Sequence, residues 1–556
     1  MFNKNLEFID NLPLKRRLEK ITSIESRVGI TYCITPTNDY VLIKDDVPSD
    51  DLQNPRKAVK QMLENNIKNP MGANDIIITF GIGLGYLLDE VYNTYSSKIF
   101  IYEPDIKLLH FVLNNVDISE HLSSGRIFIS NDIDEIISKL SATYLTKDKV
   151  EIVYLQNYAV TKNKELLFLT QKVFEACKSK MVDINTITKF SKTWLFNTIE
   201  NITYINSNNA YLLSDLENKF KGQAALIAGA GPSLTENIEY IKNHRENFVI
   251  FAVNKAVKYL LQNNIIPDFI VCLDANFVKK TLEGTENYLK DINVITDIRT
   301  DKNVAKLGFK KIFYNFSETD FFIKKLSKFN SFMEFYESGG SASILALVSA
   351  VKMGFSKVIL AGIDLAFKNN LIYSDGETMQ RISHDEIMVN KEQKKLVQVK
   401  SVTGNLVTTR EDYEAFIYHF STIIKDLDYS PIYNISSFGA NINGTKNTKI
   451  EDINIALKAN TTYVDAVNAF KFNIKEFIDE EFFHINNIIA MLSKRTFSPA
   501  LVSAVTRSIL VYQYLQADVL TVLQRNFDEE LAEKFIENTK IAIKTIVEQL
   551  QRNKLV

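Results

Sequence analysis

The segment from residue 221 to residue 445 alternates short apolar runs with helical or loop segments, and this alternation constrains the fold most strongly. Six such runs follow one another: AALIAG, FVIFAV, FIVCLD, NVITDI, KKIFYN and KVILAGID. Short apolar runs are typical of strands buried on both faces, and their alternation with helices predicts a doubly wound parallel sheet. We therefore expect a fold of the α/β class with a central Rossmann-like domain.

Two further regions flank this segment. Residues 75–104 have the pattern of strand, glycine turn, helix and strand, and GRIFIS and VEIVYL follow as further strand candidates. From about residue 451 onward only helical spacing of apolar positions remains, which predicts a helical bundle. The expected domains are an N-terminal α/β domain with a parallel sheet (1–180), the central Rossmann-like domain (181–450) and a C-terminal helical domain (451–556).

Composition excludes several classes of protein. The chain has 65 Lys and Arg against 67 Asp and Glu, so no global charge points to a nucleic acid. Cys33, Cys177 and Cys272 lie far apart, which suits a reducing cytoplasm and excludes a cysteine-rich zinc site. There is no secretory signal pattern and no run of 18 uncharged apolar residues. We expect a cytoplasmic protein without a membrane span and without a nucleic-acid partner.

The first apolar run ends in a glycine loop, LIAGAGPSLTENIEYI. Gly229 and Gly231 remove side chains where the backbone has to approach something closely, and N–H groups at a helix N-terminus attract anions. Pro232 fits a first helical turn, and Ser233 or Thr235 can cap the helix. The pattern indicates a loop that grips a phosphate group. A tight turn with a good cap and no ligand is the alternative.

Polar residues follow two neighbouring runs. Asn254 and Asp274 come at the carboxyl ends of the second and third strand candidates, the edge where open α/β sheets bind ligands. An Asn can contact a base or a sugar hydroxyl, and an Asp can accept hydrogen bonds from ribose hydroxyls. We therefore include both among the candidate nucleotide-binding residues, with a turn-stabilising Asn and a helix-capping Asp as the alternatives.

A second glycine loop, YESGGSASI, precedes the apolar helix ILALVSAVKMGF. Its candidate binding residues are Ser338, Gly339, Gly340 and Ser341, and the next strand candidate ends in Gly362 and Asp364. Two helix N-termini directed into one crevice suit a nucleotide phosphate and a second anionic group.

Several ordered motifs resemble one family. GAGPSL, NKAVKYLLQNNIIPDFIVCLD, SGGSASILALVSAVKMGFSKVILAGIDLAF and YNISSFGANINGT are similar to the central domain of bacterial motility accessory factors, proposed flagellin glycosyltransferases. The likeness covers about residues 185–445, and TFGIGLGY with IYEPD resembles that family's N-terminal domain. It implies an enzyme that transfers a nonulosonic acid (pseudaminic, legionaminic or Kdo-like) from its CMP derivative to Ser or Thr of flagellin. No cofactor beyond this donor and no metal are expected.

The central motifs are also similar to bacterial sialyltransferases that use CMP-sugars. This likeness implies that the donor is bound by Gly229, Ala230, Gly231, Pro232, Ser233, Asn254, Ser338, Gly339, Gly340 and Ser341. A tyrosine holds the donor phosphate in those enzymes, and Tyr373 is the candidate because Ala366 and Phe367 replace the nearer one. A downstream histidine serves as their base. His384 is the candidate here, and Asp364 and Asp375 are the alternatives.

Other features have less specific interpretations. Arg381 and Arg410 are candidates for binding the sugar carboxylate, although solvated surface arginines are the favoured interpretation. Gly81, Gly83 and Gly85, with Glu103 after the next strand, imitate a nucleotide-binding fingerprint whose spacing departs from the motif; a scaffold or acceptor platform is favoured. The C-terminal helices are candidates for holding the acceptor, but a simple bundle core is favoured.

Two competing functions stay open. Archaeal pterin pyrophosphokinases, which use ATP, share the GAGPSL domain, but they resemble the central domain alone. A non-catalytic flagellin chaperone or export factor that keeps the fold is the other. Nucleotide binding separates the chaperone from the enzymes, and turnover of a CMP-sugar separates the two enzymes.

Overall fold

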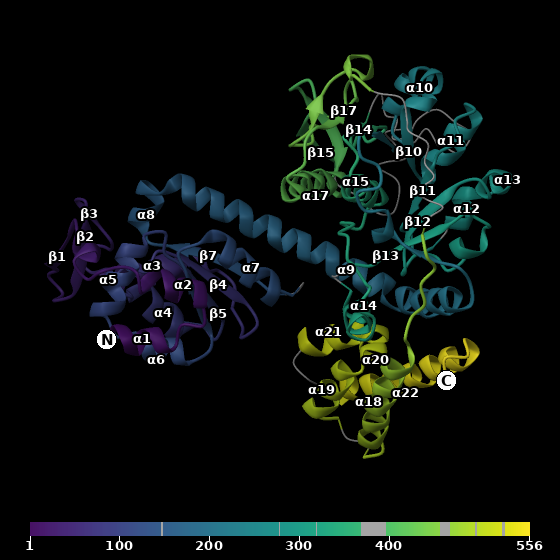
Figure 1. Cartoon of the computed structure of the whole chain (residues 1–556). Coiled ribbons are helices and arrows are strands. Elements are labelled where there is room, and N and C mark those ends of the chain that lie inside the picture. Colours follow the sequence, from purple (N-terminus) through teal and green to yellow (C-terminus); the bar gives the residue numbers. More distant parts are fainter. Residues whose placement is uncertain are drawn as a thin grey trace. The chain divides into compact units, whose positions relative to one another are not determined.

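The computed structural model describes residues 1–145, 148–276, 278–317, 320–367, 396–455, 467–494, 497–524 and 529–556. The chain divides into two compact units, each of which we describe by itself (Figure 1). Unit one is Met1–Thr188 with a short segment that begins at Leu520, and unit two is Lys189–Val519 with the C-terminal helix. Most of the C-terminal helical region thus falls in the same unit as the central sheet, and the three-domain division stays a prediction.

Unit one is built around a parallel sheet with the strand order β6-β5-β4-β7. Its strands are β4 (Ile76–Phe80), β5 (Lys98–Tyr102), β6 (Ile127–Ser130) and β7 (Val150–Tyr154). Every residue of β4 is buried, as expected for an inner strand of a parallel sheet. The connecting helices are α4 (Tyr86–Thr94), α5 (Ile106–Asn115), α6 (Ser119–Ser123) and α7 (Ile133–Thr143). All four strands predicted from the sequence are confirmed.

The rest of unit one comes before and after this sheet. It contains α1 (Phe2–Glu7), α2 (Leu12–Leu18), the antiparallel strands β1 (Ile30–Ile34), β2 (Tyr40–Lys44) and β3 (Val47–Pro48), α3 (Pro55–Asn66) and α8 (Gln156–Thr161). The chain then forms α9 (Asn163–Ser207), a helix of 45 residues whose part from Lys189 onward belongs to unit two.

Unit two contains a nine-stranded, fully parallel sheet with the order β18-β17-β14-β9-β10-β11-β12-β13-β8. Its strands are β8 (Tyr211–Leu212), β9 (Ala224–Ala228), β10 (Phe248–Val253), β11 (Phe269–Cys272), β12 (Asn293–Asp297), β13 (Ile312–Asn315), β14 (Lys357–Ala361), β17 (Ile432–Asn434) and β18 (Lys446–Asn447). The strand order reverses between β9 and β14, so the switch point where such sheets bind ligands lies there.

The six central strands predicted from apolar runs are β9 to β14, and all are confirmed. The sequence did not reveal β8, β17 and β18, each of two or three residues, or the antiparallel hairpin of β15 (Leu396–Lys400) and β16 (Leu406–Arg410). These strands are too short or too polar to show as buried runs.

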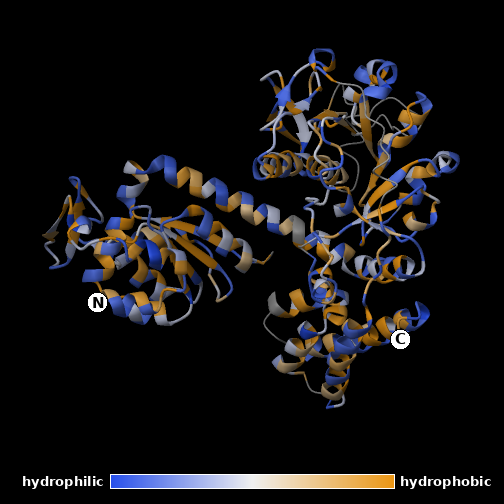
Figure 2. Ribbon diagram, viewed as in Figure 1, coloured by the Kyte–Doolittle hydropathy of each residue, from blue (hydrophilic) through white to orange (hydrophobic). Residues whose placement is uncertain are grey.

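Helices of unit two follow its strands along the chain. They are α10 (Ser233–Asn243), α11 (Val257–Gln262), α12 (Val278–Leu282), α13 (Glu286–Leu289), α14 (Phe321–Leu326), α15 (Ala342–Lys352) and α17 (Glu411–Leu427). Side chains of α15 and α17, such as Leu345 and Phe420, share one core with Ile227 and Phe251 of the sheet. Burial on most sides explains why α15 is apolar almost throughout. In Figure 2 the sheet strands are predominantly hydrophobic, whereas hydrophilic residues lie on the outer helices.

The C-terminal region is helical where the structure describes it, as predicted. Its helices are α18 (Lys475–Leu492), α19 (Pro499–Arg507), α20 (Ile509–Tyr514), α21 (Gln516–Gln524) and α22 (Glu529–Arg552). Glu481 of α18 is fully buried and accepts hydrogen bonds from Lys325 Nζ at 2.5 Å and from Ser508 Oγ at 2.8 Å. This network joins α18 and α20 to α14 beside the sheet. None of the described helices has the length and apolarity needed to cross a membrane.

Candidate functional site

The candidate residues of unit two gather at the carboxyl edge of its sheet. The loop after β9 packs directly against the loop after β14: the N–H of Gly229 donates to the carbonyl of Ala361 at 2.7 Å, and that of Gly231 to the carbonyl of Gly362 at 2.8 Å. A Cβ atom on Gly229 would lie 2.3 Å from the Gly362 oxygen. The predicted close approach is therefore real, and the partner that requires the glycines is the chain's own backbone at the switch point.

Asp364 fixes this arrangement. It is 2% exposed, and its Oδ2 accepts a hydrogen bond from the N–H of Ser233, the first residue of α10, at 2.8 Å. Its Oδ1 accepts from Ser436 Oγ, beyond β17, at 2.6 Å. Ser233 Oγ in turn accepts from the N–H of Gly362 at 3.0 Å. One carboxylate thus joins the loops after β9, β14 and β17. Burial raises its pKa.

Two expectations are corrected here. No side-chain cap from Ser233 or Thr235 starts α10, since Pro232 is the N-cap residue and Asp364 accepts the helix N–H instead. Asp364 is also a poor candidate for the base, because both of its oxygen atoms accept hydrogen bonds in a buried position. The structure gives it a positioning role. The N–H of Ala230 makes no hydrogen bond to any described residue, and phosphate binding by this loop stays a prediction.

The structure brings Asn254 and Asp274 together. Asn254, 4% exposed at the end of β10, donates from Nδ2 to Asp274 Oδ2 at 3.3 Å and to Thr281 Oγ1 at 3.1 Å. Asp274, at the end of β11, is exposed. The predicted proximity at this edge is confirmed, and nucleotide binding by the pair stays a prediction.

The second glycine loop is less open than the sequence suggested. The N–H groups of Ser338 and Gly339 both donate to Glu337 Oε1, at 3.1 and 2.8 Å. Gly339 and Gly340 have positive φ angles, which explains the glycine pair. Ser341 is the N-cap residue of α15, and its side chain makes no cap hydrogen bond. The loop therefore offers the Ser341 hydroxyl, while Glu337 occupies two of the N–H groups expected for an anion.

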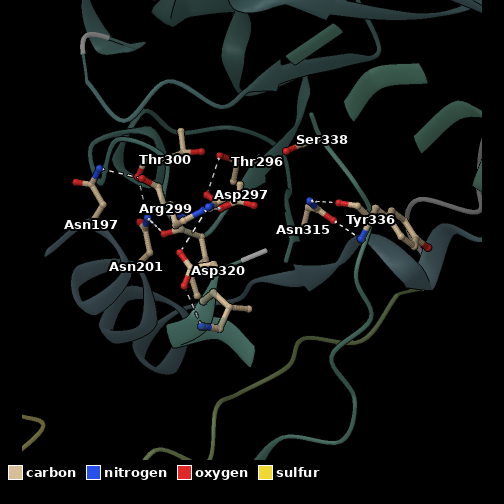
Figure 3. A network of polar contacts seen from close by, with 12 residues as sticks. Asn197, Asn201, Thr296, Asp297, Arg299, Thr300, Asn315, Asp320, Tyr336 and Ser338 are labelled. Atoms are coloured by element: carbon tan, nitrogen blue, oxygen red, sulfur yellow. Dashed lines mark hydrogen bonds and ion pairs between the residues drawn. The ribbon is translucent and has the colours of Figure 1, made fainter. Parts of the chain in front are cut away.

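A polar cluster at the ends of β12 and β13 was missed by the sequence analysis (Figure 3). Arg299 donates from Nε to Asp297 Oδ1 at 3.0 Å, and its Nη1 lies 3.5 Å from Asp320 Oδ2. The guanidinium also lies over the Trp194 ring, 5.3 Å from its centroid. Burial by itself would lower the pKa of Arg299, but the two carboxylates outweigh it and raise that pKa; burial also raises the pKa of Asp320.

Helix α9 holds this cluster in place through two asparagines one turn apart. Asn197 Nδ2 donates to the carbonyls of Ala275 and Arg299, at 2.9 and 3.0 Å. Asn201 Nδ2 donates to the carbonyls of Ile298 and Thr300, at 2.8 and 3.0 Å. Both side chains are buried. The sequence signal was the pair of asparagines on the apolar segment TWLFNTIENI, which spacing alone did not single out.

The remaining candidate residues of unit two are either not described by the structure or already paired. Tyr373, Asp375, Arg381 and His384 lie outside the described residues. Arg410 forms two hydrogen bonds with the carboxylate of Asp412, from Nε at 2.9 Å and from Nη2 at 2.8 Å. An arginine already paired in this way is less suited to hold a sugar carboxylate.

The N-terminal glycine loop is filled by its own unit. A Cβ atom on Gly81 would lie 2.2 Å from the Tyr158 ring. Glu103, fully buried, accepts hydrogen bonds from the Ile82 N–H at 3.0 Å and from the Tyr158 hydroxyl at 3.0 Å. Burial raises its pKa to about 7. Side chains of the same unit therefore fill the space beside this glycine loop, which supports the favoured scaffold interpretation.

Comparisons with known proteins agree with this architecture. Residues 196–370 match the sequence model of the family described as 6-hydroxymethylpterin diphosphokinase MptE-like. An uncharacterised protein of Treponema pallidum (strain Nichols) is 31% identical over 104 residues, which cover 19% of this chain and 48% of that relative. The chain therefore spans about half the length of this curated relative.

A solved structure, that of MAf glycosyltransferase from Magnetospirillum magneticum AMB-1, is similar over 100% of this chain and 96% of that one, with a TM-score of 0.67 and 16% identity. The chain has the MAf glycosyltransferase fold. This confirms the α/β class and the expected resemblance at the level of fold. The MAf glycosyltransferase fold includes counterparts of both units, so the likeness is not confined to the MptE-like segment.

Proposed function

We propose that this protein is a glycosyltransferase of the flagellar motility system. In this proposal it moves a nonulosonic acid (pseudaminic, legionaminic or Kdo-like) from its CMP-activated form to Ser or Thr of flagellin, in the cytoplasm. The observation that carries the proposal is the fold likeness to a MAf glycosyltransferase over the whole chain. The sequence resemblance to motility accessory factors and CMP-sugar sialyltransferases supplies the donor and the acceptor.

The reaction would break the bond between the anomeric carbon and the CMP phosphate oxygen. A bond from that carbon to the acceptor oxygen would form, the acceptor proton would pass to a base, and CMP would leave as a phosphate monoester. Asn254 and Asp274 lie at the carboxyl edge of the sheet, and the Ala230 N–H and the Ser341 hydroxyl are further polar groups of the candidate loops. These groups support a donor site at that edge. His384 and Asp375 stay predicted bases, and Tyr373 a predicted phosphate contact.

A second candidate is favoured by the family match. The MptE-like segment, residues 196–370, fits a pterin pyrophosphokinase that uses ATP. Fold likeness beyond that segment speaks for the transferase. A non-catalytic flagellin chaperone would keep the fold without nucleotide binding.

Calorimetric titration with CMP, ATP, GTP, NAD and S-adenosylmethionine tests the proposal. We expect preferential binding of CMP that Ser341→Ala weakens about 3- to 10-fold, because one phosphate hydrogen bond is lost. Ser356→Ala, which removes a hydroxyl from the amino edge of the same sheet, is the control and should bind CMP like the wild type. Preference for ATP would favour the pyrophosphokinase, and no nucleotide binding would favour the chaperone.

A further inference from the structure

A buried carboxylate oxygen at the end of β12 lacks a partner. Asp297 is 2% exposed, and its Oδ1 accepts hydrogen bonds from the backbone N–H and the Nε of Arg299, both at 3.0 Å. Its Oδ2 is inaccessible to solvent and accepts no hydrogen bond from any described residue. Buried polar atoms are almost always hydrogen-bonded, since leaving one unpaired costs free energy. This oxygen is therefore suited to a donor that the chain itself does not supply.

The charges around Asp297 limit which chemical groups can donate a hydrogen bond to its Oδ2. The guanidinium of Arg299 faces two carboxylates, those of Asp297 and Asp320, so the cluster is net negative and disfavours an anion. Within the described ranges, no group of three His, Cys, Asp or Glu side chains is arranged to hold a metal ion. A neutral hydroxyl group, which donates one hydrogen bond and adds no charge, fits best.

The free oxygen is held rigidly. Asp320 caps α14 by accepting from the N–H of Ile323 at 3.1 Å, and Asn197 and Asn201 of α9 grip the backbone on both sides of Arg299. In Figure 3 Asp297, Arg299 and Asp320 point toward one another, and Asn197 and Asn201 reach the same loop. A preorganised acceptor of this kind binds a ligand with little loss of conformational freedom.

The position of Asp297 fits a ligand that also reaches the predicted nucleotide site. Strand β12 lies beside β11, which lies beside β10, and all end at the same edge. Strands are spaced about 4.8 Å apart, so Asp297 lies on the order of 10 Å along the edge from Asn254. A nucleotide-activated sugar spans such a distance.

We propose that Asp297 Oδ2, once the groups that cover it in this structure have moved aside, accepts a hydrogen bond from a hydroxyl group of the bound substrate. Asp297, Arg299 and Asp320 together then form a hydroxyl-binding subsite, with Asp297 as its contact and the other two as positioning residues. The inference rests on the proposed function for the identity of the substrate. The hydroxyl belongs to the ribose, to the transferred sugar or to the acceptor.

Asp297→Asn tests the subsite, because the amide keeps its size and its carbonyl can still accept from Arg299, whereas the free acceptor becomes a donor. Asp268→Asn is the matched control: it also removes a carboxylate charge beside an arginine, Arg245 at 2.9 Å, but at the amino edge of the same sheet, and it leaves Asp297 in place. The wild type and both variants are titrated with CMP and CMP-N-acetylneuraminate, and the KM for the acceptor is measured. If Asp297→Asn does not fold, Asp297→Ser is judged by the same criteria.

We expect Asp297→Asn to weaken one of these interactions about 10- to 100-fold, the usual effect of losing a hydrogen bond to a charged group, and Asp268→Asn to bind like the wild type. Weaker CMP binding would assign the hydroxyl to the ribose. Loss confined to CMP-N-acetylneuraminate would assign it to the sugar, and a raised acceptor KM alone to the acceptor.

Equal behaviour of the two variants in every measurement would overturn the subsite and leave the proposed function intact. A wild type that binds neither CMP nor CMP-N-acetylneuraminate would contradict the proposed function, and the subsite would be overturned with it.

Discussion

Asp364 and Ser233 lie 131 residues apart in the sequence, yet the carboxylate of the first accepts the N–H of the second at 2.8 Å. This hydrogen bond connects the start of α10 to the loop after β14. The glycines of the GAGPSL motif are required because nothing larger fits between these two loops. The motif is thus a structural joint of the switch point as well as a candidate phosphate loop.

Gly231→Ala should destabilise this joint. A Cβ atom at residue 231 would lie 2.4 Å from Asp364 Oδ2 and 2.7 Å from the Gly362 oxygen. Overpacking of this kind lowers the free energy of unfolding by about 1–3 kcal/mol. Urea denaturation measures the change. Gly72→Ala is the control, because its Cβ would come no closer than 3.8 Å to the neighbouring atoms and its φ is not positive. Equal losses of stability in the two variants would contradict the claim that the packing of these two loops requires Gly231.

Replacing either of the two asparagines of α9 should destabilise the loop after β12. Asn197→Ala or Asn201→Ala removes two hydrogen bonds to buried carbonyls, which lowers the free energy of unfolding by about 1–3 kcal/mol. Transfer activity should fall as well, because Arg299 and Asp297 lose their support. Asn208→Ala is the control, since the side-chain amide of Asn208, directly after α9, donates to the carbonyl of Tyr204 at 3.0 Å and not to the loop after β12. Wild-type stability in all three variants would show that the asparagines of α9 do not stabilise the loop after β12.

Glu481→Ala should be far more damaging than Glu480→Ala. Glu481 is fully buried, and its removal leaves the N–H groups at the start of α20 without their acceptor and Lys325 without its buried partner, a loss of about 3–5 kcal/mol. The side chain of Glu480 is 44% exposed and pairs with the same Lys325 at 3.2 Å, so its loss should amount to less than about 1 kcal/mol. Thermal denaturation compares the two. Similar losses would mean that the exposed pair matters as much as the buried network.

Glu103 should make unit one more stable as the pH falls. Its pKa is raised from 4.5 to about 7 by burial, so the native state binds this proton more tightly than the unfolded chain does. The resulting stability is fully present below pH 4.5 and is lost as the pH rises through about 7, by at most about 3 kcal/mol. Hydrogen exchange of peptides covering β4 and β5 measures it.

Glu103→Gln should remove this pH dependence. Glu135→Gln is the control of opposite sign, because the pKa of Glu135 is lowered to about 2, first of all by its hydrogen bond to Arg17. Its contribution is present above pH 4.5 and is lost as the pH falls toward 2. An unchanged slope between pH 4.5 and 7 in Glu103→Gln would show that Glu103 does not titrate in this range.

The sequence was sufficient for the central architecture because its strands are buried on both faces. AALIA and FVIFAV, for example, are apolar at every position, and β9 and β10 are buried throughout. Strand ends in a parallel sheet share one edge, so the proximity of Asn254 and Asp274 followed from the same pattern.

The roles of single groups could not be predicted in the same way. Asp364, Glu337 and Tyr158 occupy N–H groups or space that the motifs seemed to leave for a ligand, and each reaches its partner through tertiary packing. Arg299 and Asp297 belong to TDIRTD, a polar stretch that has no motif spacing. Its importance comes from Asp320 and from Asn197 and Asn201 of α9, which only the fold brings to it.

Mass spectrometry of flagellin tests the central claim most directly. Purified flagellin is incubated with a CMP-activated nonulosonic acid and with either the wild-type protein or the Asp297→Asn variant. The intact mass of the product is then recorded. We predict that flagellin gains the mass of one or more nonulosonic acid residues on Ser or Thr, and that CMP is released in equal amount. Unmodified flagellin together with an intact donor, for pseudaminic, legionaminic and Kdo donors alike, would contradict the account.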